Sequence, residues 1–105
     1  MESYENSGSY LEIIGSQGSK VMMEKLGIKP GKASKVKVGK TLEIELYVPI
    51  RLGVPVRKVR EIDNPDPERQ RKGIEITTKI LSILKINEVE YLIETQTSTY
   101  KLLLN

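Results

Sequence analysis

The fold is decided by residues 73–104, which read GIEITTKILSILKINEVEYLIETQTSTYKLLL. This is the longest run of the chain that is dense in Ile, Val, Leu, Thr and Tyr, the residue types that favour strands. Apolar and polar residues alternate through 74–79 and again through 89–95, which is the pattern of half-buried strands. The run predicts three strands with tight connections, at 74–85, 89–95 and 100–104.

Two parts of this run are apolar on both faces. At residues 80–84 the alternation fails, which indicates either a strand covered on both faces or a bulge that shifts the register. At residues 102–104 the strand either lies centrally in its sheet or is covered by a partner chain, because an exposed apolar edge would aggregate. The Thr-rich segment 95–99 could bind phosphate through its hydroxyls, but Thr is also a good strand residue, and we favour the structural interpretation.

Composition limits the chemistry that the chain can perform. With 105 residues the chain is expected to form one domain, and it contains neither Cys nor His. It therefore has no disulfide framework, no thiolate or imidazole metal ligand and no Cys nucleophile. Glu43 and Glu45 could form an acid–base pair, yet alternating Glu on a solvent face explains them more simply. We expect no enzyme activity, no cofactor and no metal.

The patterned segments in the N-terminal part of the chain are shorter. Residues 1–9 are polar and predict a flexible tail, so the single β-rich domain is expected at 10–105. A short strand is expected at 10–14. A short helix is expected near 20–26, capped by Ser19 and ended by Gly27. The abundance of Lys and Glu suggests a thermophilic source. A polar N-terminus without a long apolar run favours the cytoplasm and no membrane partner.

The middle of the chain predicts a hairpin followed by irregular structure. A short strand at 35–38 and a Gly39–Lys40 turn lead into the best-patterned strand, 41–50, which Pro49 ends. Residues 54–62 predict an irregular edge strand because of Pro55. Residues 63–73 form a hydrophilic excursion with one possible turn of helix, and this loop is either mobile or presented for binding. The whole predicts an all-β or β-dominated small domain, a barrel or sandwich of about six strands with one short helix.

Residues 21–46 carry a local likeness to a known family. Val21 to Gly31 reads VMMEKLGIKPG and is followed by Val36-Lys37-Val38 and by LEIEL at 42–46. This pattern resembles the second half of AbrB/MazE-type swapped-hairpin domains. The resemblance implies an intertwined dimer that binds DNA through a basic face. No binding residue is taken from the family, because the strand expected to contact DNA, residues 10–14, contains no Lys or Arg.

The distribution of charge points to a class of partner. The net charge is only +3, but residues 20–60 hold eleven basic residues against three acidic ones. A positive surface binds phosphates without catalytic groups. The alternative is an ordinary solvated surface of a Lys-rich protein. The candidate residues for backbone contact to nucleic acid are Lys35, Lys37, Lys40, Arg57, Lys58, Arg60, Arg69 and Arg71.

Two functions follow from these patterns. The first is a small non-catalytic nucleic-acid-binding protein with a candidate regulatory role, expected to form a homo-oligomer such as a dimer. The second is a protein–protein adaptor or a structural subunit of a larger assembly, viral or plasmid-encoded among others. The apolar segments 80–84 and 102–104 motivate the second, because both faces of each could be covered by a partner.

Overall fold

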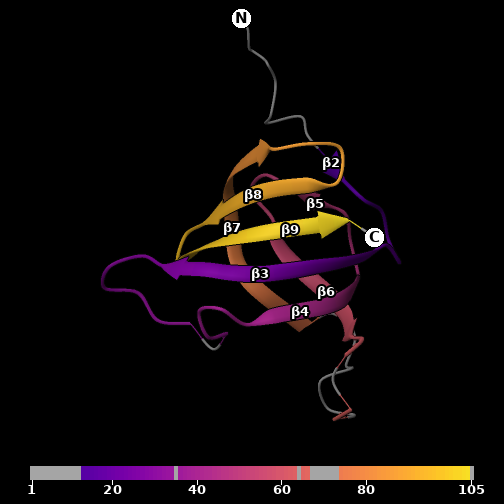
Figure 1. Cartoon of the computed structure of the whole chain (residues 1–105), viewed down its shortest axis with the longest axis horizontal. Coiled ribbons are helices and arrows are strands. Elements are labelled where there is room, and N and C mark those ends of the chain that lie inside the picture. Colours follow the sequence, from indigo (N-terminus) through magenta and orange to yellow (C-terminus); the bar gives the residue numbers. More distant parts are fainter. Residues whose placement is uncertain (1–12, 35, 64, 67–73, 105) are drawn as a thin grey trace, which may run out of the picture.

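The computed structural model describes residues 13–34, 36–63, 65–66 and 74–104, and the tail expected at 1–9 lies outside these residues. Six strands close into an antiparallel barrel in the order β3-β4-β6-β7-β8-β9, and two short strands form a separate pair (Figure 1). The strands are β2 (Ile13–Ile14), β3 (Lys20–Ile28), β4 (Thr41–Leu46), β5 (Ile50–Arg51), β6 (Pro55–Glu61), β7 (Ile74–Lys85), β8 (Glu90–Thr95) and β9 (Ser98–Leu104). The prediction of a small β-dominated domain is confirmed.

The C-terminal run forms three consecutive barrel strands, β7, β8 and β9, as its alternation predicts. The register between β7 and β8 shifts between Ile80 and Ser82, so a bulge explains the broken alternation there. β9 pairs with β8 on one side and β3 on the other. The apolar C-terminal strand is therefore central in its sheet, and closure of the barrel leaves β9 without a free edge.

The expected helix near 20–26 is wrong, because these residues lie in strand β3. Val21, Met23 and Lys25 alternate inward along β3, and all three are buried. β3 pairs with β4 on one side and with β9 on the other, the latter joining Val21 to Leu104. These ladders satisfy the backbone groups that a helix would satisfy locally, and tertiary pairing overrides a weak local preference.

Other boundaries also differ from the expectation. Residues 36–38 form no strand, and the turn is closed by Lys40 N–H donating to the carbonyl of Lys37 at 3.1 Å, with Gly39 at a positive φ of 87°. The strand expected at 41–50 divides into β4 and β5 around Pro49. Of the strand expected at 10–14, the described part is β2, which pairs with β5. The possible helical turn after Asp66 lies outside the described residues.

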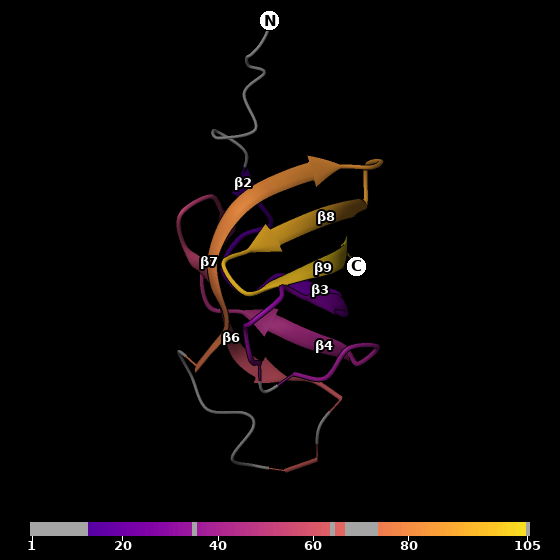
Figure 2. The ribbon, with the colours of Figure 1, turned by 90° about the vertical axis from the view of Figure 1, so that its left-hand side faces the viewer.

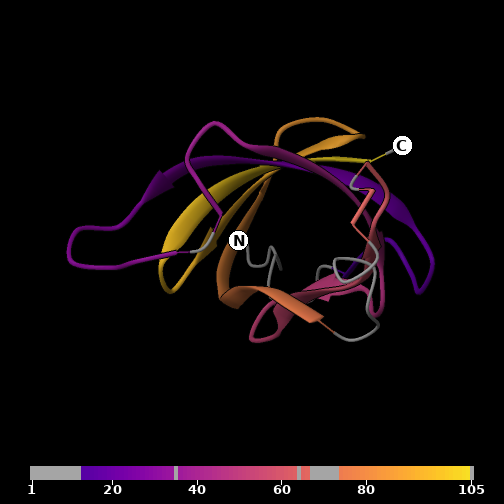
Figure 3. The same cartoon turned by 90° about the horizontal axis from the view of Figure 1, so that it is seen from below.

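The strands curve round a closed interior (Figure 3), which is filled mainly by Ile, Leu, Val, Met and Tyr side chains. Because neighbouring strands are antiparallel, β3, β6 and β8 end where β4, β7 and β9 begin, and we call this end the barrel mouth. Ile14 and Ile50 of the β2–β5 pair join the core next to Leu46, at the opposite end. Figure 2 shows β7 curving along the barrel toward its hairpin with β8, which lies away from the mouth.

Candidate functional site at the barrel mouth

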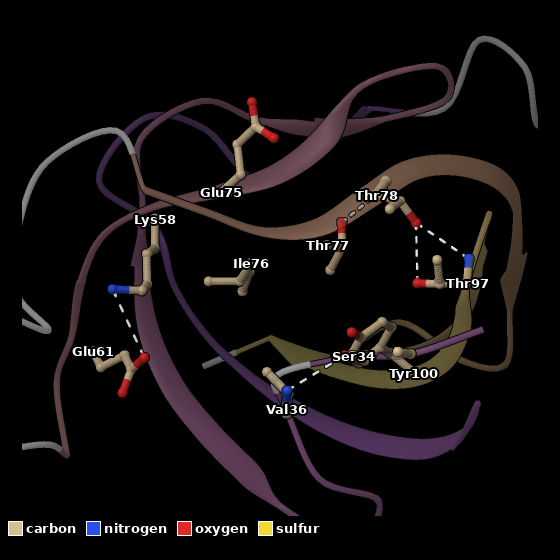
Figure 4. Close-up of a pocket in the computed structure, with 11 residues that line it drawn as sticks. Ser34, Val36, Lys58, Glu61, Glu75, Ile76, Thr77, Thr78, Thr97 and Tyr100 are labelled. Atoms are coloured by element: carbon tan, nitrogen blue, oxygen red, sulfur yellow. Dashed lines mark hydrogen bonds and ion pairs between the residues drawn. The ribbon is translucent and has the colours of Figure 1, made fainter.

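A polar pocket with a volume of about 330 Å³ lies at the barrel mouth. Ala33 and Val36, from the segment between β3 and β4, form part of its wall, and Ile76 adds a third apolar side chain. Figure 4 shows the polar side chains around it, with Lys58 and Glu61 on one side and the hydroxyl residues on the other. The polar lining consists of Ser34, Lys58, Glu61, Glu75, Thr77, Thr78, Thr97 and Tyr100.

A buried ion pair forms one wall of the pocket. Lys58 Nζ lies 3.7 Å from Glu61 Oε1, and each side chain is only 2% exposed. Residues three apart on a regular strand would face opposite sides of the sheet. The register between β4 and β6 shifts between Lys58 and Arg60, so an extra residue brings both Lys58 and Glu61 to the interior. Lys58 shares the inward face of Val56 by regular alternation, and the bulge adds Glu61 to that face.

The opposite wall is a network of hydroxyl groups. Thr78 and Thr97 share a hydrogen bond of 3.2 Å between their hydroxyls, and Thr97 N–H also donates to Thr78 Oγ1 at 3.2 Å. Thr97 Oγ1 lies 3.3 Å from Ser98 Oγ. Burial raises the pKa of Tyr100, while hydrogen bonds with Ser98 and Ser34 act in the opposite direction. The Thr-rich segment therefore has a clear structural role, and one of its residues, Thr97, also lines the pocket.

Lys25 is the buried cation that the sequence patterns missed. Its side chain is 0% exposed, and its Nζ lies 5.4 Å from the ring centroid of Tyr100. Among the described residues this Nζ has no hydrogen-bond partner. Desolvation lowers the pKa of Lys25 from its ordinary value of 10.5. Alternate residues of a strand share a face, so Lys25 would have been expected to point inward with Val21 and Met23 if residues 20–28 had been recognised as a strand.

The segment between β3 and β4, residues 29–40, is rich in lysine, and we call it the lysine loop. Lys32, Lys37 and Lys40 are exposed there, and none forms an ion pair with a described acidic residue. The loop is anchored at its base, where Lys29 N–H donates to the carbonyl of Thr97 at 2.8 Å. Lys29 Nζ also lies 2.6 Å from Glu94 Oε2.

The predicted basic residues that the structure describes differ in exposure and in their partners. Lys37 and Lys40 are exposed on the lysine loop, whereas Arg60 is exposed on the outside of β6 and its Nε donates to Glu45 Oε1 at 3.1 Å. Arg57 is half-buried, with its guanidinium 5.5 Å from the ring centroid of Tyr47.

Lys58 does not lie on the expected phosphate-contact surface, because it is buried and ion-paired with Glu61. Lys58 lies two residues after the buried Val56, so regular alternation along β6 directs it inward. Lys35, Arg69 and Arg71 lie outside the described residues, so their predicted contacts stay predictions.

The two glutamates weighed for acid–base chemistry lie on the outer face of β4. Glu45 is engaged with Arg60, and Glu43 lies beside it on the outer face of β4. Within the described ranges no group of three or more acidic residues is placed to hold a metal ion. What the mouth offers is a concave polar site lined by one buried ammonium group, that of Lys58, and by hydroxyl donors, a common type of ligand-binding position in barrels.

Fold and site together define a closed six-stranded antiparallel barrel with a polar pocket at one end and a lysine-rich loop beside it. No protein-family model, curated protein or solved structure matches this chain. A membrane-spanning helix is not found in the part of the chain that the structure describes.

Proposed function

We propose that this protein is a small non-catalytic nucleic-acid-binding protein that contacts the phosphate backbone through the lysine loop. The observation that carries the proposal is the exposure of Lys32, Lys37 and Lys40 without acidic partners among the described residues. Arg60 on β6 and Lys85 on β7, in contrast, lie beside the carboxylates of Glu45 and Glu88. Uncompensated lysines release condensed counterions when they meet a phosphate backbone, and this favours binding.

The proposed contacts are to phosphates and carry little sequence information. Lysine is a flexible point charge, suited to phosphate oxygens rather than to bidentate recognition of a base. Lys35, Arg69 and Arg71 belong to the proposed contact set by sequence, while Arg57 and Arg60 are secondary members because Tyr47 and Glu45 already engage them. The resemblance of residues 21–46 to AbrB/MazE-type domains would also imply a nucleic-acid partner, namely DNA.

The first experiment measures binding by fluorescence anisotropy with labelled duplex DNA, single-stranded DNA and structured RNA at several salt concentrations. The test variant carries Lys32→Gln, Lys37→Gln and Lys40→Gln. We expect it to bind all sequences more weakly and to lower the magnitude of the salt slope by about three units, one for each phosphate contact. Duplex or structured RNA is expected to bind better than single strands, because exposed aromatic residues for base stacking are few.

The matched control removes the same charge elsewhere. Its substitutions are Lys20→Gln, Lys85→Gln and Lys101→Gln, all on strands outside the lysine loop. The control is expected to retain most of the affinity and of the salt slope. Equal losses in the two triple variants would mean that only net charge matters, and absence of binding at low salt would refute the proposal.

A second function, a protein–protein adaptor, is favoured by a separate observation. The hairpin between β7 and β8 exposes four large apolar side chains, each 51–57% exposed: Leu81, Leu84, Ile86 and Val89. Clusters of exposed apolar side chains mark interaction sites on soluble proteins. A partner or a second copy of this chain that covers the hairpin would bury them.

The oligomeric state tests this second function. We expect size-exclusion chromatography with light scattering to show a stable oligomer, and a variant with Leu84→Glu and Ile86→Glu to be monomeric. Both positions are exposed in the single chain, so the substitutions are expected to leave its folding intact. A wild-type monomer that retains no partner on purification would count against the adaptor.

A further inference from the structure

The interior of the barrel mouth holds unequal numbers of positive and negative groups. Lys25 and Lys58 are buried there, and Glu61 is the one buried carboxylate among the described residues. Lys58 and Glu61 face each other, which leaves Lys25 with the face of the Tyr100 ring and no hydrogen-bond partner in the described part of the chain. A buried ammonium in this condition is unfavourable, because desolvation is not offset by an opposite charge.

The pocket, which Tyr100 lines and Lys25 does not, presents groups that suit an anion with several oxygens. Tyr100 joins the two features, since its ring faces Lys25 and its side chain lines the pocket. The hydroxyls of Ser34, Thr78 and Thr97 also line the pocket, and each can rotate to donate to an oxygen acceptor. Figure 4 shows these hydroxyl side chains gathered on the side of the pocket that holds Tyr100.

The acidic residues of the pocket do not oppose an anion on that side. Glu61 is compensated by Lys58 across 3.7 Å. Glu75 is exposed, and Figure 4 shows its carboxylate directed away from the hydroxyl residues. The remaining interior charge is that of Lys25. The lysine loop supplies Ser34 and Val36 to the wall, and its exposed Lys37 and Lys40 would raise the local concentration of anions near the entrance.

We propose that the barrel mouth is a binding site for a small phosphate-type oxyanion, with Lys25 as its counter-charge and the hydroxyls of Thr78, Thr97 and Ser34 as donors. The anion draws the Lys25 ammonium from the ring of Tyr100 into a charge-assisted hydrogen bond, which is stronger than a contact with an aromatic face. A volume of about 330 Å³ admits a phosphate monoester with a small organic group. The site does not depend on the backbone contacts proposed for the lysine loop.

The experiment compares wild-type protein with Lys25→Met, which keeps an unbranched side chain one atom shorter and removes its charge. Isothermal titration calorimetry with inorganic phosphate and with a nucleoside 5′-monophosphate measures affinity, and thermal unfolding measures stability. We expect Lys25→Met to be more stable than wild type without ligand and to weaken binding of both anions about tenfold or more. Lys20→Met, on the outer face of the same strand, is the control and is expected to bind as wild type does.

A second variant and a spectroscopic readout keep the result interpretable. Thr97→Val removes a donor without changing charge, and it is expected to weaken phosphate binding without raising stability. In wild type, nuclear magnetic resonance of the Lys25 side chain should show the Lys25 pKa rising when phosphate is added, because an anion favours the charged form. Phosphate affinity that is the same in Lys25→Met and wild type, or a Lys25 pKa that does not respond to phosphate, would overturn the proposal.

The source of the phosphate is resolved by two further arms. A 5′-phosphorylated oligonucleotide that binds better than its 5′-hydroxyl counterpart, with the difference lost in Lys25→Met, would assign the site to a nucleic-acid terminus. A nucleoside monophosphate that binds while the two oligonucleotides do not differ would assign it to a free metabolite. Salt-dependent binding of a 5′-hydroxyl duplex should persist in Lys25→Met, so failure of this site and failure of the lysine-loop proposal are separable.

Discussion

The buried pair of Lys58 and Glu61 allows the sharpest test of the barrel interior. Each side chain is 2% exposed, and their charged atoms are 3.7 Å apart. With an effective dielectric constant near 20, Coulomb's law gives an attraction of about 4 kcal/mol at this distance. Removing one partner leaves the other charge buried, so Lys58→Met and Glu61→Leu are each expected to lower the free energy of unfolding by about 3–5 kcal/mol.

The double variant should behave differently from the single ones. Replacing both charges with apolar side chains removes the desolvation penalty along with the attraction, and such replacements range from neutral to about 1–4 kcal/mol stabilising. A small domain has only about 5–15 kcal/mol of total stability, so each single variant should lower the melting temperature by roughly 12 °C or more, and the double variant should recover it. Chemical denaturation of the four proteins at neutral pH gives the coupling energy as a double-mutant cycle.

An outer ion pair of similar composition provides the control. Arg60 and Glu45 are closer, at 3.1 Å, but lie on the outside of β6 and β4, where coupling is typically about 0.2–1 kcal/mol. We expect the longer, buried pair to couple more strongly than the shorter, exposed pair. Single variants at 58 and 61 that cost less than about 1 kcal/mol would refute the burial of this pair.

Three further predictions concern single side chains. The ammonium of Lys29 lowers the pKa of Glu94 below its ordinary value of 4.5. The resulting stabilisation is present at pH values above 4.5 and is lost as the pH falls through the pKa of the folded state. In Lys29→Met, nuclear magnetic resonance titration should show the Glu94 pKa rising toward 4.5. Burial raises the pKa of Tyr100 above 10.0, so its ionisation should favour unfolding as the pH rises past 10, which parallel absorbance and circular dichroism titrations can detect. Ile93→Ala should cost about 2–5 kcal/mol in denaturant unfolding, because Ile93 is 0% exposed.

The sequence predicted well those strands whose alternation is strong and whose partners are near in the chain. β7, β8 and β9 are joined by short turns, so the local pattern of residues 74–104 contains most of the information that forms them. Asn87 illustrates this, since its side chain accepts a hydrogen bond from Val89 N–H at 3.0 Å in the turn after β7. Such turn chemistry can be recognised from residue types alone.

β3 could not be predicted in the same way, because its partners are distant in sequence. Val21 lies opposite Ile44 on one side and Leu104 on the other. Ser19 and Gly27 are typical boundaries of a helix, and a short apolar run fits a helix or a strand equally well. Only closure of the barrel, which brings the C-terminal strand to β3, decides between them.

The candidate site was predicted in part, for a related reason. The density of lysine between 20 and 40 was visible, but its direction was not, because direction depends on strand assignment and on bulges. Lys37 and Lys40 are exposed, whereas Lys25 and Lys58 point into the barrel. Basic residues that were expected to share one surface are thus divided between the exposed rim of the barrel and its buried interior.

Antiparallel closure also separates the two candidate functions in space. The lysine loop joins β3 to β4 at the mouth, and the apolar hairpin joins β7 to β8, so the alternation of strand direction puts them at opposite ends of the barrel. Two copies joined through the hairpins would therefore keep both lysine loops available. In such a dimer, a duplex long enough to span both loops gains avidity, while a short duplex does not. If both functions are correct, Leu84→Glu with Ile86→Glu should weaken binding of long duplexes and leave short ones unaffected, whereas equal effects on both lengths would show that the hairpin itself contacts nucleic acid.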